Sequence, residues 1–341
     1  MSSPVPGLRS DAPDEGSVER TPASPVAYAP RSEGELPLGA RGRLRAVVAS
    51  LRPHQWTKNL VLFAAPALSK HLFEPDPLLR SVVAFAVFCG LSGTVYLLND
   101  VADVERDRLH PRKRLRPVAS GALPPNAALG VAVALSAVCL PASFFLGSAF
   151  GACALVYLLL NLVYSGKLKE VVILDVLSIS LGFVLRAVAG AFAVGVEISN
   201  WLLVCTLLLA LFLALSKRRH ELTSLNHFAP EHRRSLAEYS PYLLDQMISV
   251  VTASCLVAYA FYTMAPETVE KYRTERLAWT IPFVLYGIFR YLYLVHQKDQ
   301  GGSPTDLLVT DRPLLVDVAL WAAAILFIVY TAPGAPMPIG R

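Results

Sequence analysis

Apolar runs about as long as the hydrocarbon core of a bilayer recur along this chain and limit its possible folds. A helix needs about 20 mainly apolar residues to cross a bilayer. Nine runs approach that length, at residues 59–74, 80–98, 127–146, 148–164, 171–194, 198–216, 244–264, 278–297 and 314–332. The first run is the shortest and contains Pro66. The pattern predicts an all-α, polytopic membrane protein with nine transmembrane helices.

Composition supports this class and excludes others. Only 17% of the 341 residues are charged, whereas soluble domains average about 25%. The net charge of +5 comes from bases in short loops between apolar runs, so no nucleic-acid partner is expected. All five cysteines lie in apolar runs without CxxC or Cys/His spacing, which predicts neither a zinc site nor a disulfide framework.

The flanks of the apolar region differ from it in composition. Residues 1–40 are rich in Pro, Ser, Gly and Glu and are expected to form a disordered cytoplasmic tail. They contain no apolar core behind a basic start, so no signal peptide is expected. Residues 41–58 carry five bases and Trp56, a pattern typical of an interfacial amphipathic segment. The transmembrane domain is expected at 59–332, with a short C-terminal tail at 333–341.

Loop charges predict the orientation in the membrane. If the N-terminus is cytoplasmic, the loops at 99–126, 165–170, 217–243 and 298–313 are cytoplasmic as well. These loops hold 15 Lys and Arg residues, against 5 in the loops on the other side. The positive-inside rule therefore favours a cytoplasmic N-terminus, and it places all the motif-bearing loops on one side of a cell membrane.

The stretch Asn99–Pro117 follows the second run and combines acids with bases. Asp100, Asp103 and Asp107 fall at i, i+3 and i+7, which places them on one face of a continuing helix. Three carboxylates there would repel each other unless a cation lies among them. Proteins commonly bind Mg²⁺ through one or two carboxylates plus substrate phosphates. The spacing predicts a magnesium–diphosphate site, for which an incidentally charged loop is the alternative.

A second group of polar residues begins at the end of the fourth run. Tyr164, Lys167 and Lys169 lie in the loop, and Asp175 and Arg186 lie within the next run. The last two are eleven residues apart, so they share a helix face, about 16 Å apart along the axis. Ionisable groups inside a span usually face a cavity or a partner. We expect a lined cavity, and the alternative is a set of buried structural pairs.

Two further loops carry weaker candidates. The sequence Ser216–Glu221 contains Lys217, Arg218 and Glu221 as possible site residues, although a stop-transfer cluster explains Arg219 and His220. The loop from Ser303 to Pro313, with Asp306, Asp311 and Arg312, could close over the cavity or could cap helices. The two main groups follow runs two and four, so they would face each other across the cytoplasmic mouth of the bundle. Aspartates would bind a metal there, and lysines and arginines would bind phosphate oxygens.

The first motif resembles that of the UbiA superfamily of membrane prenyltransferases. The pattern is Asn-Asp-x-x-Asp-x-x-x-Asp followed by bases and Arg-Pro, and the matching residues are Asn99, Asp100, Asp103, Asp107, Lys113, Arg116 and Pro117. The resemblance covers roughly residues 45–332. It implies a bundle of nine helices, a cavity that opens laterally to the bilayer, a cytoplasmic active-site mouth and Mg²⁺ as cofactor.

The second motif departs from the aromatic prenyltransferases of that family, which usually carry several aspartates there. Lys167 and Lys169 stand where acids would be expected. The chain resembles the decaprenyl-phosphate phosphoribosyltransferase branch instead, in the patterns Tyr164-Ser-x-x-Leu-Lys169, Leu174-Asp175, Gly182-Phe-x-x-Arg186, Arg52-Pro-x-x-Trp56-x-Lys58 and Thr310-Asp-Arg-Pro313. That branch implies transfer of phosphoribose from 5-phosphoribosyl 1-diphosphate (PRPP) to a polyprenyl phosphate, for cell-envelope precursors.

The resemblance also implies roles for individual residues. Metal ligands would be Asp100, Asp103, Asp107 and Asp175. Substrate-binding residues would be Asn99, Lys58, Lys113, Arg116, Tyr164, Lys167, Lys169 and Arg186. The alternative enzyme is a UbiA-type transferase that moves a polyprenyl group from its diphosphate to an aromatic acceptor. A transporter of a lipid-linked anion is the second alternative, and a homo-oligomer is possible in each case.

Overall fold

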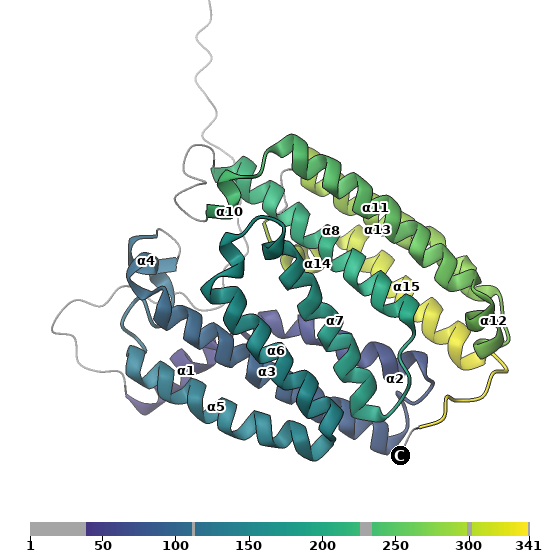
Figure 1. The fold of residues 1–341 in the computed structure, drawn as a ribbon, viewed down its shortest axis with the longest axis horizontal. Helices are drawn as coiled ribbons and strands as arrows, with labels where there is room; N and C mark the ends of the chain where they lie inside the picture. Colours follow the sequence, from purple (N-terminus) through teal and green to yellow (C-terminus); the bar gives the residue numbers. More distant parts are fainter. Residues whose placement is uncertain (1–38, 111–112, 226–233, 299–301, 340–341) are drawn as a thin grey trace, which may run out of the picture.

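The computed structural model describes residues 39–110, 113–225, 234–298 and 302–339, and every regular element within these ranges is helical (Figure 1). The α-helices are α1 (Ala40–Ser50), α2 (Ala64–Leu68), α3 (Pro75–Ala102), α4 (Val104–Leu109), α5 (Pro125–Leu146), α6 (Ser148–Gly166), α7 (Leu174–Val194), α8 (Asn200–Leu225), α10 (Arg234–Ala237), α11 (Pro241–Met264), α12 (Pro266–Tyr272), α13 (Ile281–Gln297), α14 (Pro304–Thr310) and α15 (Arg312–Thr331). Short 3₁₀ helices are η1 (Pro53–Phe63), η2 (Lys113–Leu115), η3 (Leu168–Glu170) and η5 (Arg276–Thr280). The all-α prediction is confirmed.

Eight helical stretches of the described chain are long and apolar enough to cross a membrane. They are α3, α5, α6, α7, α8, α11, η5 with α13, and α15, and they match eight of the nine predicted runs. Proline occupies the first turn of α3, α5 and α11, where its missing N–H breaks no helical bond. Helix α8 runs nine residues beyond the predicted end at 216, because its polar last turns extend past the apolar run.

The predicted first span is the exception, because it is not a single long helix. Its chain forms η1 and then α2, and the expected boundary at 59 falls inside η1. This broken segment still connects the two ends of α3: Arg52 bonds Asp100 near the C-terminus of α3, while Glu74 precedes its N-terminus. The nine-helix prediction is therefore corrected to eight long helices and one broken helical crossing among the described residues.

Close packing against α7 holds the broken segment in place. A Cβ atom on Gly190 of α7 would lie 2.1 Å from the carbonyl oxygen of Leu62, so only glycine allows the two backbones to come this near. The packing places Lys58 and Asn59 of η1 beside Arg186 one turn before Gly190. The glycine thus helps to bring polar groups from two distant parts of the chain together.

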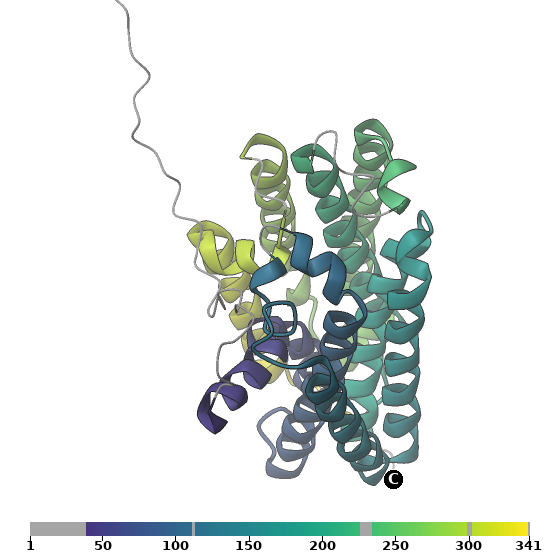
Figure 2. The ribbon, with the colours of Figure 1, turned by 90° about the vertical axis from the view of Figure 1, so that its left-hand side faces the viewer.

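Apolar side chains form cores inside the bundle and also cover its outside. One core cluster joins α3, α5, α6 and α7 around Phe88, Phe150 and Tyr157, and another joins α7, α8, α11 and α13 around Phe212 and Tyr291. Large apolar side chains are exposed along α5 and α15. Water would not favour so much exposed apolar surface, and lipid would. Figure 2 shows the long helices standing side by side, with α1 at the periphery.

The C-terminal residues pack against the start of the transmembrane domain. Lys70 Nζ donates to the carbonyl oxygen of Ala332 at 2.8 Å, and Met337 N donates to Ser69 O at 3.3 Å. Figure 1 shows α12 and the C-terminus near one end of the bundle, whereas α4 and α10 lie at the other. The predicted tail at 333–341 is docked over its described part.

Candidate active site

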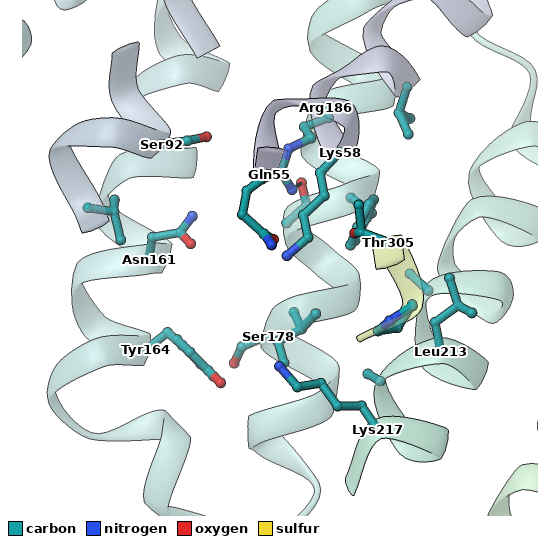
Figure 3. A pocket seen from close by; sticks show the side chains of 18 of the residues that line it. Gln55, Lys58, Ser92, Asn161, Tyr164, Ser178, Arg186, Leu213, Lys217 and Thr305 are labelled. Atoms are coloured by element: carbon teal, nitrogen blue, oxygen red, sulfur yellow. Dashed lines mark hydrogen bonds between the residues drawn. The ribbon is translucent and has the colours of Figure 1, made fainter. Parts of the chain in front are cut away.

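A cavity of about 430 Å³ lies inside the bundle, near the end that carries α4 and α10. Its walls come from η1, α3, α6, α7, α8 and α14. Figure 3 shows Gln55 and Lys58 pointing into this space from one side, with Tyr164, Ser178 and Lys217 directed toward it from the other. Segments as far apart in sequence as Gln55 and Leu308 therefore meet at one polar chamber.

The lining of this cavity is cationic. Lys58, Arg186, Lys217 and Arg218 all line it, and no Asp or Glu is among its lining residues in the described chain. Asn99, Tyr164 and Asn161 add neutral polar groups. Two of these cations are paired behind the wall, Lys217 with Glu221 and Arg218 with Asp175 and Glu221. The face that the wall presents to a ligand still carries basic groups without acidic ones, which suits phosphate oxygens.

Arg186 is fixed deep in the wall by neutral groups. Its Nε donates to Asn59 Oδ1 at 2.8 Å, Nη1 to Gly182 O at 3.0 Å, and Nη2 to the Tyr157 hydroxyl at 2.6 Å. Its guanidinium also lies over the rings of Tyr157 and Phe183. It is 7% exposed, and no described carboxylate lies within 4.0 Å of it. The positive charge is thus oriented toward the cavity without an acidic partner.

Lys58 is the second cation of the cavity lining for which no ion pair with a described carboxylate is found within 4.0 Å. Burial is the main cause that lowers the pKa of its ammonium group to about 7; the charges of Lys217, Arg186 and Arg52 act in the same direction, and that of Asp306 opposes them. Clustered cations and desolvation both disfavour the charged form of a lysine. A bound anion would reverse this effect, so the group is poised to gain charge when a phosphate enters.

The acids of the first motif lie at the rim of the cavity and are already neutralised by arginines. Asp100 and Asp107 are 1% and 3% exposed. Arg116 Nη1 lies 3.2 Å from Asp100 Oδ1 and 2.6 Å from Asp107 Oδ2, so one nitrogen bridges both carboxylates. Arg52 Nη2 lies 2.5 Å from the same Asp100 oxygen. Arg116 was expected to bind phosphate. In this structure its guanidinium binds Asp100 and Asp107 instead.

The three acids were expected on one face of a continuous helix, and this prediction is wrong for Asp103. Helix α3 ends at Ala102, and Asp103 separates it from α4. The break sends Asp103 outward, where its Oδ2 lies 3.8 Å from Lys169 Nζ in the second motif. The two motif loops therefore face each other, as the sequence predicted, and an ion pair joins them.

Asp175 lies in a separate buried cluster. Its Oδ2 accepts from Arg218 Nε at 2.7 Å and its Oδ1 from the Tyr239 hydroxyl at 2.9 Å. Arg218 also bonds Glu221 and reaches the Tyr164 hydroxyl at 3.5 Å. Burial raises the pKa of Tyr239, which keeps this hydroxyl a donor. Asp175 thus orients Arg218 and, through it, Tyr164 toward the cavity. The sequence had suggested a different role for Asp175, that of a metal ligand.

The first-motif acids fit a divalent cation, whereas Asp175 does not. Asp100 and Asp107 already converge on one cationic nitrogen of Arg116, and carboxylate oxygens are the donors that Mg²⁺ prefers. Both oxygens of Asp175 are occupied by protein donors. In the described part of the chain, no three His, Cys, Asp or Glu side chains gather as a metal site. A cation here would take substrate phosphates as its other ligands, as Mg²⁺ commonly does.

The fourth loop combines both predicted roles. Ser303, Pro304, Thr305 and Leu308, from α14 and its N-cap, line the cavity. Asp311 caps α15 through Leu314 N at 2.9 Å and also pairs with Arg290. This pairing lowers the pKa of the Asp311 carboxyl. The start of the loop therefore closes the cavity, while its end stabilises helices.

Other predicted residues lie outside the cavity wall. Lys167 is exposed, and Lys113 lies in η2, where its backbone N donates to His110 Nδ1 at 3.3 Å. Conversely, the cavity contains polar residues that sequence analysis missed. Tyr157 and Asn161 share a face of α6 with the predicted Tyr164, at a spacing of i, i+4 and i+7. That polar stripe within an apolar run was a usable signal.

These features define a multi-pass helical membrane protein with an internal polar cavity. Residues 60–307 match the UbiA prenyltransferase family. Among known structures, the chain resembles a UbiA homologue from Archaeoglobus fulgidus bound to GPP and Mg²⁺, with a TM-score of 0.66 at 18% identity, over 84% of this chain and 100% of that one. The chain belongs to the UbiA prenyltransferase family, and it is a transferase of that type.

Two of the similar relatives share a name. The decaprenyl-phosphate phosphoribosyltransferase of Corynebacterium glutamicum is 35% identical over 84% of this chain and 87% of its own length. The enzyme of the same name from Mycolicibacterium smegmatis is 31% identical over 82% of this chain and 91% of its own length. The expected homo-oligomer gains no support from these similarities.

Proposed function

We propose that this protein transfers 5-phosphoribose from PRPP to a polyprenyl phosphate and releases diphosphate. The observation that carries the proposal is the charge of the cavity, whose described lining has four cations and no carboxylate. PRPP brings a diphosphate and a 5-phosphate, and the lipid acceptor brings one more phosphate. The names of the two curated relatives support the same substrate pair.

The reaction exchanges one bond at ribose C1 for another. The bond from C1 to the diphosphate oxygen breaks, and the diphosphate leaves with the electron pair. A phosphate oxygen of the lipid attacks C1 and forms the new bond. A phosphate monoester is already anionic near neutral pH, so the reaction does not require a strong general base. A divalent cation at the rim acids would supply charge neutralisation for the leaving diphosphate.

The residues divide into two groups under this proposal. Asp100, Asp103 and Asp107 hold the metal that accompanies the diphosphate. Phosphate oxygens are bound by cations and hydroxyls around the chamber and its mouth, which are Lys58, Lys113, Arg116, Tyr164, Lys167, Lys169 and Arg186, with Asn99 between the two groups. Arg186 faces the lipid phosphate, because it lies about three turns into α7 from the helix start that carries Asp175. Asp175 acts only by positioning Arg218 and Tyr164.

The alternative is a prenyl transfer from a polyprenyl diphosphate to an aromatic acceptor. That donor carries all the phosphate of the reaction, and its neutral acceptor gives no reason for further cations. Lys58 and Arg186, which form no ion pair within 4.0 Å with a described carboxylate, favour the PRPP reaction. A transporter of a lipid-linked anion is disfavoured because the family is one of transferases.

Purified protein in detergent tests the proposal. It is incubated with Mg²⁺ and either PRPP with polyprenyl phosphate, or polyprenyl diphosphate with an aromatic acceptor, and the lipids are analysed by mass spectrometry. We expect polyprenyl-phosphoryl-5-phosphoribose from the first pair only, and its loss in Asp103→Ala. Prenylated aromatic product from the second pair, with no reaction from the first, would refute the proposal. Turnover in detergent also excludes transport as the primary activity, since no membrane gradient exists there.

A further inference from the structure

The arginines at the rim acids occupy positions that a divalent cation would need. Arg116 Nη1 lies between Asp100 Oδ1 and Asp107 Oδ2, and Arg52 Nη2 contacts the same Asp100 oxygen. Both acids are almost fully buried. A buried carboxylate without a counter-charge is strongly unfavourable. The guanidinium groups therefore stabilise the acids when no metal is bound.

The position of Arg52 depends on its left-handed backbone conformation and on a contact with the Tyr96 ring. The φ and ψ of Arg52, 52° and 64°, lie in the left-handed region. This conformation costs a residue with a Cβ atom free energy, and such residues cluster at functional sites. Its guanidinium lies 4.8 Å from the centre of the Tyr96 ring, and Tyr96 lines the cavity. Arg52 thus stands on the border between the acids and the chamber that would receive phosphate.

Charge balance decides which ligand these arginines admit. Two carboxylates and two guanidinium groups are close to neutral together. A divalent cation that entered alone would add two positive charges to this cluster, so its binding would compete with both arginines. A metal–diphosphate complex retains negative charge, and its phosphate oxygens could bind the arginines that the carboxylates release.

We propose that Arg52 and Arg116 are exchangeable counter-ions that couple metal binding to diphosphate binding. In the free protein they occupy the acids and oppose the metal. When metal and diphosphate enter together, the carboxylates pass to the metal and the arginines turn to the diphosphate oxygens. The enzyme thereby avoids holding a metal without its substrate. This inference depends on the proposed function only in placing the metal at Asp100 and Asp107.

Binding of Mn²⁺ alone gives the first measurement, because Mn²⁺ is paramagnetic and needs no turnover. The full chain in detergent is titrated with Mn²⁺ and the free ion is followed by EPR. Arg116→Gln removes the bridge between the acids, and we expect it to bind Mn²⁺ at least tenfold more tightly than the wild type. Arg52→Gln, which frees only Asp100, should show a smaller gain. Arg114→Gln is the matched control, because this exposed arginine of η2 forms no ion pair with a described acid.

Binding of inorganic diphosphate at saturating Mg²⁺ gives the second measurement, by calorimetry. Here we expect the opposite sign: Arg116→Gln and Arg52→Gln should bind diphosphate at least tenfold more weakly than the wild type, with Arg114→Gln unchanged. A purely structural arginine would weaken both ligands together. The opposite changes are therefore the signature of counter-ion exchange.

The proposal fails if both variants bind Mn²⁺ no more tightly than Arg114→Gln, or if both lose metal and diphosphate in parallel. If one variant does not elute as folded protein from a sizing column, the other alone decides the question. Neither measurement uses PRPP or lipid. A negative PRPP turnover assay would therefore refute the proposed function and leave the counter-ion exchange intact, whereas unchanged Mn²⁺ binding would refute only the exchange.

Discussion

Lys169 Nζ lies 3.8 Å from Asp103 Oδ2 and so joins the loop after α6 to the end of α3. The two side chains are 20% and 27% exposed, and ion pairs this accessible contribute only about 0–1 kcal/mol to stability. The pair therefore does little to hold the fold. Its value lies in placing a cation of the second motif next to an acid of the first, at the mouth of the cavity.

Lys169→Ala should impair catalysis without destabilising the protein. A hydrogen bond to a charged group contributes about 1.5–3 kcal/mol, so loss of a phosphate contact should raise the KM for PRPP roughly tenfold or more. Initial rates at varied PRPP and thermal unfolding in detergent measure the two effects. Lys298→Ala, an exposed lysine outside the proposed site, is the control. An unchanged KM would remove Lys169 from the substrate-binding residues.

Asp175→Asn should destabilise the protein without weakening metal binding. Asp175 is fully buried and pairs with Arg218. Removing one partner of a buried ion pair costs about 3–5 kcal/mol, so the unfolding temperature should fall clearly. Mn²⁺ affinity should stay that of the wild type, since Asp175 bonds protein donors through both oxygens. Mn²⁺ titration by EPR beside thermal unfolding checks this. A loss of Mn²⁺ affinity equal to that of Asp103→Ala would restore Asp175 as a metal ligand.

Local patterns predicted the helices and the motif loops well. A membrane span is determined by a run of about 20 residues, and the eight long helices follow such runs within a few residues, apart from the end of α8. The two loops that carry the motifs were also expected at the same end of the helix bundle, and the contact of Lys169 with Asp103 agrees with that placement. These features depend only on neighbours in sequence.

Partners from distant segments were beyond such patterns. Arg52 and Asp100 are 48 residues apart, and Asp175 pairs with Arg218 across 43. Helical periodicity placed Asp175 and Arg186 on one face. It could not tell that α8 supplies Arg218 as the partner of Asp175, whereas Arg186 bonds only neutral groups. The break at Asp103 was missed for the same reason, because its side chain is turned toward a loop 66 residues away.

Gly190→Ala should displace the broken first crossing. The added Cβ would meet the backbone of Leu62 at 2.1 Å, and backbone cannot move aside as a side chain can. Overpacking costs typically about 1–3 kcal/mol, and η1 would shift together with Lys58. We expect a lower unfolding temperature and a higher KM for PRPP.

Gly130→Ala is the matched control for this change. It adds the same atom within α5, where a Cβ would meet nothing within 4 Å. Alanine is favoured over glycine in a helix interior by about 1 kcal/mol, so this variant should be slightly more stable than the wild type. Equal effects of the two substitutions, measured by thermal unfolding in detergent, would show that the approach of Leu62 to Gly190 does not limit the packing.

Lys58 should make phosphate binding depend on pH near neutrality. Its pKa in the free protein is lowered to about 7, so the charged form predominates below pH 7 and is lost as the pH rises above it. A bound phosphate favours the charged form and raises this pKa. Binding of PRPP at pH 7.5–8 should therefore take up a proton, and the KM for PRPP should rise with pH above 7. Calorimetry in two buffers of different ionisation enthalpy measures the proton, and Lys58→Arg, which stays charged, should abolish both the uptake and the rise. If Lys58→Arg keeps the wild-type pH profile, another group titrates and Lys58 does not contact the phosphate.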